Sequence, residues 1–319
     1  MYVVGIDGGG TKTSIALFDI TGKYYGTQIE SYPSCLDSKS FEKTNPQLEK
    51  SIIKLIPPHS EEEIVLSSIF LGLGGIASTK DALFVESLVK TWKICKESTQ
   101  IHAKNDIYCA HAAGLRGKTG MCFIIGTGSV GFGVDETGNE HRVGGYSPME
   151  GDPGSSYHLG RMLLKALAKA LDLRRSYSPL LTAVQQHLHI HGYTDYVNMI
   201  NTISREETAQ LAQLVTQYAD VGDKFAVKLI ERATDEITLM FHTIYQTLEI
   251  HNKQIAIVGS LGNAKSKYKE ILYQKVKAID ANYEIFPTQL DPAIGSAILA
   301  FKHLQNENYQ NFLPHAERK

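Results

Sequence analysis

The chain has 319 residues, of which 43% are hydrophobic and 21% charged, and its formal net charge is −2. This composition is ordinary for a soluble globular protein, and the length favours two domains because single cores rarely grow beyond about 250–300 residues. The near-neutral charge argues against a nucleic-acid or membrane partner, and no apolar stretch approaches the roughly 20 residues that span a bilayer. The N-terminus has no signal-peptide pattern and the cysteines form no CxxC pair, so we expect a reduced, cytoplasmic protein.

The first third of the chain predicts strands followed by alternating helices and strands. Short apolar segments indicate strands over residues 2–6, 14–20 and 24–32. Their links, GGGTKT and TGK, have hairpin lengths and residues, so we expect an antiparallel meander. Next come a helix over 40–56, a strand over 64–73, a helix over 80–92, a strand over 101–106 and a helix over 109–115. This order predicts a mixed sheet with helices on its faces.

A polar break, RGKTG at 116–120, marks the expected domain boundary, with a first domain over 1–117 and a second over 118–319. Beyond it the order strand, Gly/Thr loop, strand, turn, strand recurs up to residue 144. Expected helices over 155–171, 179–189, 206–221 and 223–250 form a helical insertion, about 155–250. A strand over 254–258, a helix over 266–279, a strand over 283–287 and a helix over 292–304 finish the chain. The last helix is able to return to the first domain.

The segment GIDGGGTKTS, residues 5–14, places three glycines after an apolar run. Glycine lets a tight turn bring its backbone N–H groups close to a ligand, and such amide clusters bind phosphate. The carboxylate of Asp7 is expected to hold Mg²⁺ through water. The spacing is neither that of a Walker A loop nor GxGxxG, and a hairpin without a ligand is the alternative. The expected phosphate-binding residues here are Gly8, Gly9, Gly10, Thr11, Lys12 and Thr13.

Two further loops suit a nucleotide. IGTGS, residues 125–129, repeats the Gly/Thr hairpin at the start of the second half. VGSLG, residues 258–262, ends a buried strand in small residues, where a flat ring can lie on the backbone, although a tight strand-to-helix turn is the alternative. The expected phosphate ligands are Gly126, Thr127, Gly128 and Ser129, and the expected adenosine contacts are Gly259, Ser260 and Gly262.

Two aspartates are candidates for contact with a phosphate acceptor. Asp106, in KNDIYCAHAAG, lies between an expected strand and a helix. It either caps that helix or acts as the general base that takes the proton of an acceptor hydroxyl. Asp152, in GDPGSSYHLGR, either caps the following helix or accepts hydrogen bonds from substrate hydroxyls.

Together these motifs resemble the acetate kinase, sugar kinase and actin superfamily of ATP-dependent phosphotransferases. DGGGTKT is similar to its first phosphate motif, IGTGS to its second and VGSLG to its adenosine motif. LGLGGI at 71–76, ND at 105–106, GGY at 144–146 and MEGDPGSSYHLGR at 149–161 resemble the N-acetylglucosamine kinase branch, the BadF/BadG/BcrA/BcrD ATPases. The resemblance covers essentially the whole chain.

The resemblance implies an α/β protein with two ribonuclease H-like, actin-like ATPase domains and a cleft between them. It implies ATP and Mg²⁺ as cofactors and a homodimer. It matches Asp106 to the catalytic base, Asp152 to a sugar ligand and Asp7 to the metal-linked aspartate. Cys35 stands where many sugar kinases of this branch have asparagine, and Val130 stands where some members have it, so the identity of the sugar stays open. The substrate-binding residues that it implies are Ser34, Gly74, Gly75, Asn105, Asp106, Gly145, Tyr146 and Asp152.

The sequence therefore predicts a kinase that phosphorylates the primary (6-) hydroxyl of an amino sugar, with N-acetylglucosamine favoured and glucosamine or N-acetylmuramic acid as alternatives. Two other classes are open. One is an activator ATPase of the 2-hydroxyacyl-CoA dehydratase type, which needs cysteine ligands for a [4Fe–4S] cluster. The GLGGI and GDPGS loops, where such ligands would be sought first, hold no cysteine. The other is a regulator that binds ATP and sugar without catalysis.

Overall fold

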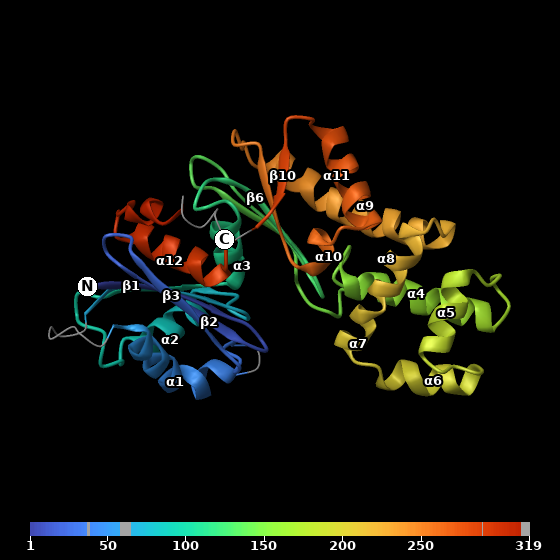
Figure 1. Cartoon of the computed structure of the whole chain (residues 1–319), viewed down its shortest axis with the longest axis horizontal. Coiled ribbons are helices and arrows are strands. Elements are labelled where there is room, and N and C mark those ends of the chain that lie inside the picture. The colour runs from blue at the N-terminus through green and yellow to red at the C-terminus, as the bar shows by residue number, and fades with distance from the viewer. Residues whose placement is uncertain (37–38, 58–64, 289, 314–319) are drawn as a thin grey trace. The chain divides into compact units, whose positions relative to one another are not determined.

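A computed structural model describes residues 1–36, 39–57, 65–288 and 290–313 (Figure 1). The chain forms two compact units. Unit 1 comprises Met1–Lys118 and Thr288–Lys319, and unit 2 comprises Thr119–Pro287. The last helix, α12 (Pro292–His303), thus belongs to the unit that contains the N-terminus. None of the helices in the described ranges is long and apolar enough to cross a membrane.

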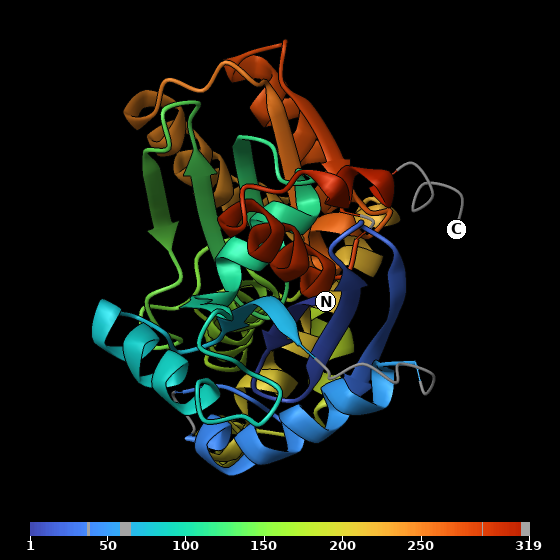
Figure 2. The same ribbon diagram turned by 90° about the vertical axis from the view of Figure 1, so that its left-hand side faces the viewer.

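Unit 1 holds a five-stranded mixed sheet in the order β3-β2-β1-β4-β5. β1, β2 and β3 form the predicted antiparallel meander, and β4 and β5 continue the sheet in parallel with β1. Helices α1 and α2 cover one face and α3 and α12 cover the other (Figures 1 and 2). The elements are β1 (Tyr2–Gly8), β2 (Thr13–Asp19), β3 (Tyr24–Glu30), α1 (Ser40–Leu55), β4 (Leu66–Leu73), α2 (Thr79–Val89), β5 (Gln100–Lys104), α3 (Asp106–Gly114) and α12.

Strand β1 is buried on both faces because helices pack against each side of it. Val4 and Ile6 belong to the core beneath α1 and α2, whereas Val3 belongs to the core beneath α12. Gly5 faces α12 at very short range: a Cβ built there would lie 2.1 Å from the backbone oxygen of Ala293. The missing side chain therefore allows α12 to lie directly on the strand that leads into the first glycine loop.

Unit 2 repeats the architecture with the sheet order β10-β9-β6-β7-β8 and a large helical layer. As predicted, β6, β7 and β8 are antiparallel neighbours, and β9 and β10 extend the sheet in parallel with β6. The elements are β6 (Gly120–Ile125), β7 (Ser129–Val134), β8 (Glu140–Gly144), α4 (Ser156–Leu171), α5 (Pro179–His187), α6 (Tyr193–Thr202), α7 (Arg205–Gln210), α8 (Ala212–Asp220), α9 (Lys224–Thr247), β9 (Gln254–Val258), α10 (Ser260–Asn263), α11 (Lys267–Ile279) and β10 (Glu284–Pro287).

The helical layer differs from the sequence prediction at two places. The single helix expected over 206–221 is two helices, α7 and α8. They separate at Leu211, whose amide donates to the backbone oxygen of Thr208 and whose backbone oxygen accepts from the amide of Leu214. Both bonds span three residues, as in a 3₁₀-helix. Helix α6 was not predicted. It buries no residue fully, although Tyr196, Met199 and Ile203 at helical spacing pack against the core of unit 2.

Candidate functional site

The first glycine loop connects β1 to β2 and is held by its neighbours in unit 1. The backbone N–H of Gly9 donates to Lys12 at 3.1 Å and closes the turn. The amide of Ser34 donates to the oxygen of Gly9 at 3.1 Å, and that of Gly74 donates to Gly8 at 2.9 Å. The structure thus brings Gly8, Gly9, Ser34 and Gly74 together, as the candidate site requires.

Two of the residues predicted to contact ligands in this region use their side-chain hydroxyls in hydrogen bonds within the protein. Thr13 is fully buried, and its Oγ1 donates to the backbone oxygen of Tyr32 at 2.9 Å. Ser34 is also fully buried, and its Oγ is hydrogen-bonded to Thr44 Oγ1 at 2.9 Å. These side chains support the loop. The exposed residues at its tip are Gly10, Thr11 and Lys12.

Asp106 is the first residue of α3. It does not cap this helix, so the capping role, one of the two roles predicted for Asp106, is wrong. The cap is Asn105, whose Oδ1 accepts from the amide of Ile107 at 3.3 Å and whose Nδ2 donates to Ile76 at 3.1 Å. Strand β5 correspondingly ends at Lys104, two residues earlier than predicted. The carboxylate of Asp106 lies beside Gly74, since a Cβ built on that glycine would be 3.7 Å from Oδ2.

Asp7, near the end of β1, has a strongly perturbed carboxyl group. Burial, followed by the negative charges of Asp106 and Asp291, raises the pKa of Asp7 to about 7, while Lys12 opposes this change. Negative charge therefore exceeds positive charge around Asp7. No group of three or more His, Cys, Asp or Glu side chains in the described ranges could hold a metal. A divalent cation held by one or two carboxylates, waters and phosphates fits both observations.

The second glycine loop, in unit 2, is held by the start of α4. The amides of Ser156 and Tyr157 donate to the backbone oxygens of Gly126 and Thr127 at 2.9 and 3.2 Å. Ser129 is buried, and its Oγ donates to the oxygen of Pro153 at 2.6 Å. This loop also meets the third motif. A Cβ built on Gly126 would lie 3.9 Å from Gly259 Cα and 4.0 Å from Ser260 N.

A cavity of about 410 Å³ lies where these two motifs meet. Thr127 and Ser260, both predicted contacts, line it. Gly262 instead packs inward, because a Cβ there would lie 2.5 Å from the side chain of Ile257. The wall formed by α7 and α8, which includes Gln210, Gln213 and Thr216, was missed by sequence reasoning. No sequence signal marks that wall, because tertiary packing alone brings it to the loops.

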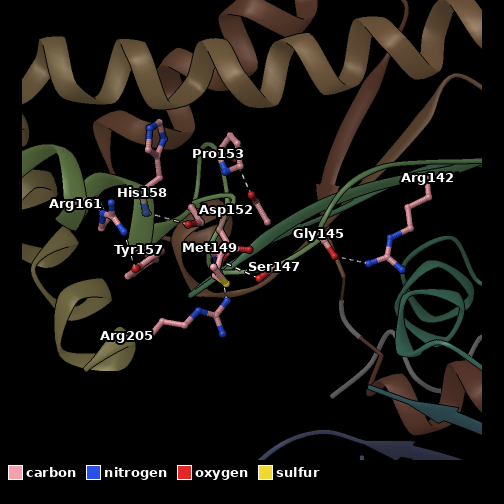
Figure 3. Close-up of polar contacts among 12 residues, drawn as sticks. Arg142, Gly145, Ser147, Met149, Asp152, Pro153, Tyr157, His158, Arg161 and Arg205 are labelled. Atoms are coloured by element: carbon pink, nitrogen blue, oxygen red, sulfur yellow. Dashed lines mark hydrogen bonds and ion pairs between the residues drawn. The ribbon is translucent and has the colours of Figure 1, made fainter. Parts of the chain in front are cut away.

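Asp152 lies next to the second glycine loop (Figure 3). Its side chain is only 6% exposed, and its Oδ2 accepts from Arg205 at 2.7 Å. A Cβ built on Gly128 would be 2.9 Å from Oδ1 of the same carboxylate. The capping interpretation of Asp152 is wrong, because Ser155 caps α4 and its Oγ accepts from the amide of His158 at 3.1 Å. Arg205, 53 residues away in sequence, was not predicted.

The remaining predicted residues lie in turns. Gly75 follows β4 with φ +85°, and Gly145 follows β8 with φ +68°. The backbone oxygen of Gly145 accepts from Arg142 at 2.7 Å, and Tyr146 is 81% exposed. No hydrogen bond in the described parts of unit 2 joins either Gly145 or Tyr146 to Asp152.

Comparison with known proteins identifies the family of this chain. The model of the BadF/BadG/BcrA/BcrD ATPase family matches residues 4–300. The chain belongs to this family. The family description implies the use of ATP, and the resemblance inferred from the motifs is confirmed.

Relatives of this family member span nearly its whole length. N-acetyl-D-glucosamine kinase of Dictyostelium discoideum is 29% identical over 310 residues, covering 93% of this chain and 97% of the relative. N-acetylmuramic acid/N-acetylglucosamine kinase of Clostridium acetobutylicum is 27% identical over 307 residues, covering 94% and 98%. A crystal structure from Chromobacterium violaceum, of a candidate N-acetylglucosamine kinase, has a TM-score of 0.70 at 23% identity and covers 94% and 98%. That similarity confirms the fold of two mixed sheets flanked by helices.

Proposed function

We propose that the protein is an ATP-dependent kinase that phosphorylates the primary (6-) hydroxyl of an amino sugar, with N-acetylglucosamine as the favoured acceptor. The observation that carries the proposal is the position of Asp106. Its carboxylate stands beside Gly74, whose amide binds the first glycine loop at Gly8. A carboxylate next to an anion-binding loop has the chemistry that phosphoryl transfer to a hydroxyl requires.

In this proposal unit 1 supplies the base and the first phosphate loop, and unit 2 supplies the nucleotide pocket and the second loop. Asp106 takes the proton of the acceptor hydroxyl as the hydroxyl oxygen attacks the γ-phosphorus, the bond from that phosphorus to the bridging oxygen breaks and ADP leaves. Backbone amides of both loops, Lys12 and the helix start behind Gly126 stabilise the charge that develops on the phosphate. Adenosine occupies the cavity beside Thr127 and Ser260. Asp7 holds Mg²⁺, which supplies charge neutralisation when bound.

The sugar contacts are proposed at Asp152, at the Ser34 and Gly74 region and at the turn of Gly145 and Tyr146. Within unit 1, Cys35 lies beside Gly74, because a Cβ on Gly74 would be 3.5 Å from Cys35 Cβ. We further propose a cytoplasmic homodimer that acts on a small-molecule amino sugar. This assembly and location are supported by the family resemblance alone.

The thiols argue against the electron-transfer alternative. A [4Fe–4S] cluster needs accessible thiolates. Of the four cysteines, Cys35, Cys109 and Cys122 are buried and Cys95 alone is partly exposed, so no two accessible thiols are available to such a cluster.

The proposal is tested by a panel of sugars assayed for ADP release with ATP and Mg²⁺. We expect release with N-acetylglucosamine, and phosphorus NMR of the product should show a phosphomonoester on the 6-oxygen. Glucosamine, N-acetylmuramic acid, glucose and N-acetylmannosamine complete the panel. ADP release at the same rate with and without every sugar would refute a sugar kinase.

A further inference from the structure

Asp152 and Arg205 form an ion pair that lies directly on the second glycine loop of unit 2 (Figure 3). Nη2 of Arg205 donates to Oδ2 of Asp152 at 2.7 Å. A Cβ built on Gly128 would lie 2.8 Å from that nitrogen and 2.9 Å from the other carboxylate oxygen, Oδ1. The glycine thus leaves room for the pair, and both charged groups lie at the loop to which the proposed function assigns phosphate.

The backbone and the side chain of Asp152 are both held in place. Its φ of +45° lies in the left-handed region, which residues other than glycine adopt infrequently. The amide of Ser155 donates to the backbone oxygen of Asp152 at 3.0 Å and closes this turn. Among the described residues, the carboxylate has a hydrogen-bond partner only at Oδ2. Arg205 therefore sets the direction of Oδ1, which is able to accept from a ligand hydroxyl.

Arg205 is the first residue of α7, and the start of this helix is held by its cap and by α4. Ser204 Oγ accepts from the amide of Glu207 at 3.1 Å, and the amide of Ser204 donates to the Glu207 carboxylate at 2.8 Å. Helix α7 approaches α4 at Gly160, where a Cβ would overlap the backbone oxygen of Thr208. The position of the guanidinium consequently follows the position of α7.

The same helix forms part of the proposed nucleotide cavity. Three lining residues of that cavity belong to α7: Glu206, Ala209 and Gln210. The first of them directly follows Arg205 in the chain. At its other end, α7 is separated from α8 by the 3₁₀-type turn at Leu211, and such turns often mark hinges within helical segments. One short helix thus contacts both the nucleotide cavity and Asp152.

We propose that Arg205 is a positioning residue that presents the Asp152 carboxylate to the acceptor sugar, and that α7 thereby makes sugar binding depend on the nucleotide. The inference rests on the proposed function, in which Asp152 binds the sugar and the cavity binds adenosine. Nucleotide in the cavity fixes α7 and with it the guanidinium, which holds Oδ2 and leaves Oδ1 directed at a sugar hydroxyl. Because coupling between two binding sites is reciprocal, the sugar tightens nucleotide binding by the same factor.

Calorimetric titration with N-acetylglucosamine measures this coupling, with and without a saturating non-hydrolysable ATP analogue and Mg²⁺. In the parent protein the analogue should lower the sugar Kd at least about fivefold. In Arg205→Gln the sugar Kd without nucleotide should rise about tenfold, and the coupling should fall below about twofold. Arg205→Lys should restore most of both, because the contact uses one terminal nitrogen, which an ammonium group can replace.

A double-mutant cycle shows whether Arg205 acts through Asp152. Asp152→Asn keeps the shape of the side chain and tolerates a left-handed backbone, but it loses the charge. The sugar Kd of Arg205→Gln/Asp152→Asn should therefore match that of Asp152→Asn within about twofold. Arg232→Gln is the matched control and should behave as the parent, because Arg232 is an exposed arginine of α9 that does not line the cavity.

Four outcomes overturn the proposal. In Arg205→Gln they are a parental sugar Kd or a parental coupling factor. In the cycle it is losses that multiply in the double variant, as two independent structural effects would. In the parent it is a sugar Kd that the analogue leaves unchanged.

The Kd of each variant for the analogue alone checks its folding. Asp152→Asn by itself should also reduce the coupling below about twofold, so the proposal remains testable if Arg205→Gln does not fold. Calorimetry reports binding whether or not phosphate is transferred. A parent protein that binds the sugar but releases no ADP would therefore refute the proposed function and still decide this inference, whereas one that binds no sugar of the panel overturns both.

Discussion

The imidazole ring of His303, at the end of α12, stacks on that of His102 in β5 with ring centroids 3.6 Å apart and planes inclined by 13°. Phe70 of β4 stacks against His303 with centroids 5.9 Å apart. Burial, followed by the neighbouring charges of His102 and Lys104, lowers the pKa of His303 to about 4. Burial also lowers the pKa of His102, with Glu86 opposing. The stack therefore requires neutral rings.

Acid should weaken the attachment of α12 to the sheet. The pKa of His303 is lower in the folded state than the usual unfolded value near 6.5, so the stabilisation is complete above pH 6.5 and is lost as pH falls toward 4. His303→Phe keeps a stacked ring without a titrating group. Because solvent screens this helix end, we expect a gain of about 1 kcal/mol at pH 5, roughly 2–4 °C in Tm, and no gain at pH 8.

Thermal unfolding followed by circular dichroism from pH 4.5 to 8 measures this difference. His251→Gln is the control, since His251 is exposed and belongs to unit 2, whereas α12 belongs to unit 1. A His303→Phe protein whose Tm falls with acid as steeply as that of the parent would contradict the interpretation.

Much of the fold was accessible from the sequence because its signals are local. The hairpins at GGGTKT and TGK, the strand over 254–258 and the starts of most helices depend on residues that are neighbours in the chain. The three motifs were recognised for the same reason. The two units also repeat one architecture, so each half supported the interpretation of the other.

What the sequence missed is of two kinds, the choice between nearby polar residues and contacts between distant ones. Asn105 and Ser155, rather than Asp106 and Asp152, cap their helices, and polar residues within three positions of one another cannot be separated by pattern alone. The ion pair of Arg205 with Asp152 joins residues 53 positions apart. The sequence suggested the return of the last helix to the first domain, but not that it packs on Gly5 at the opposite end of the chain. No periodic pattern in the sequence predicts such contacts.

Divalent-cation binding at Asp7 should depend on pH in the neutral range. With a pKa of about 7, the carboxyl is mostly protonated at pH 6 and mostly ionised at pH 8. Only the carboxylate attracts the cation, so the apparent affinity for Mg²⁺ in the presence of ADP should tighten about tenfold between these values. Isothermal titration at several pH values measures it, together with the protons released.

Two variants make this prediction specific. Asp7→Asn should weaken Mg²⁺ binding and remove its pH dependence between 6 and 8. Asp291→Asn removes one of the charges that raise the pKa of Asp7, so the same transition should shift to lower pH. A parent protein whose Mg²⁺ affinity is constant over this interval would exclude Asp7 as the titrating ligand.

Filling the proposed adenosine cavity should weaken nucleotide binding without unfolding the protein. Ala264 lines the cavity and is exposed, so Ala264→Trp places an indole in the space with little cost to the core. We expect the Kd for ADP to rise at least about tenfold and Tm to stay within about 1 °C. Ala281→Trp, at an exposed position outside the cavity, is the matched control. Equal ADP affinity in both variants would place the nucleotide elsewhere.

Replacing Asp106 should separate chemistry from nucleotide binding. In Asp106→Asn the side chain keeps its shape at the start of α3 but can no longer take a proton, so kcat with the accepted sugar should fall about 10²–10⁴-fold. The proposed adenosine cavity is lined by residues of unit 2 and not by Asp106, so the Kd for ADP should stay within about twofold. Glu97→Gln removes an exposed carboxylate from the same unit as a control for the loss of charge.

The distinguishing result for Asp106 is the pattern across three parameters. A base acts only in the transition state, so its loss should lower kcat and kcat/KM for the sugar by similar factors. Asp106→Ala should give the same loss of kcat, with an added rise in KM where the carboxylate also orients the hydroxyl. A near-parental kcat in either variant would show that another group takes the proton and that Asp106 is not the general base.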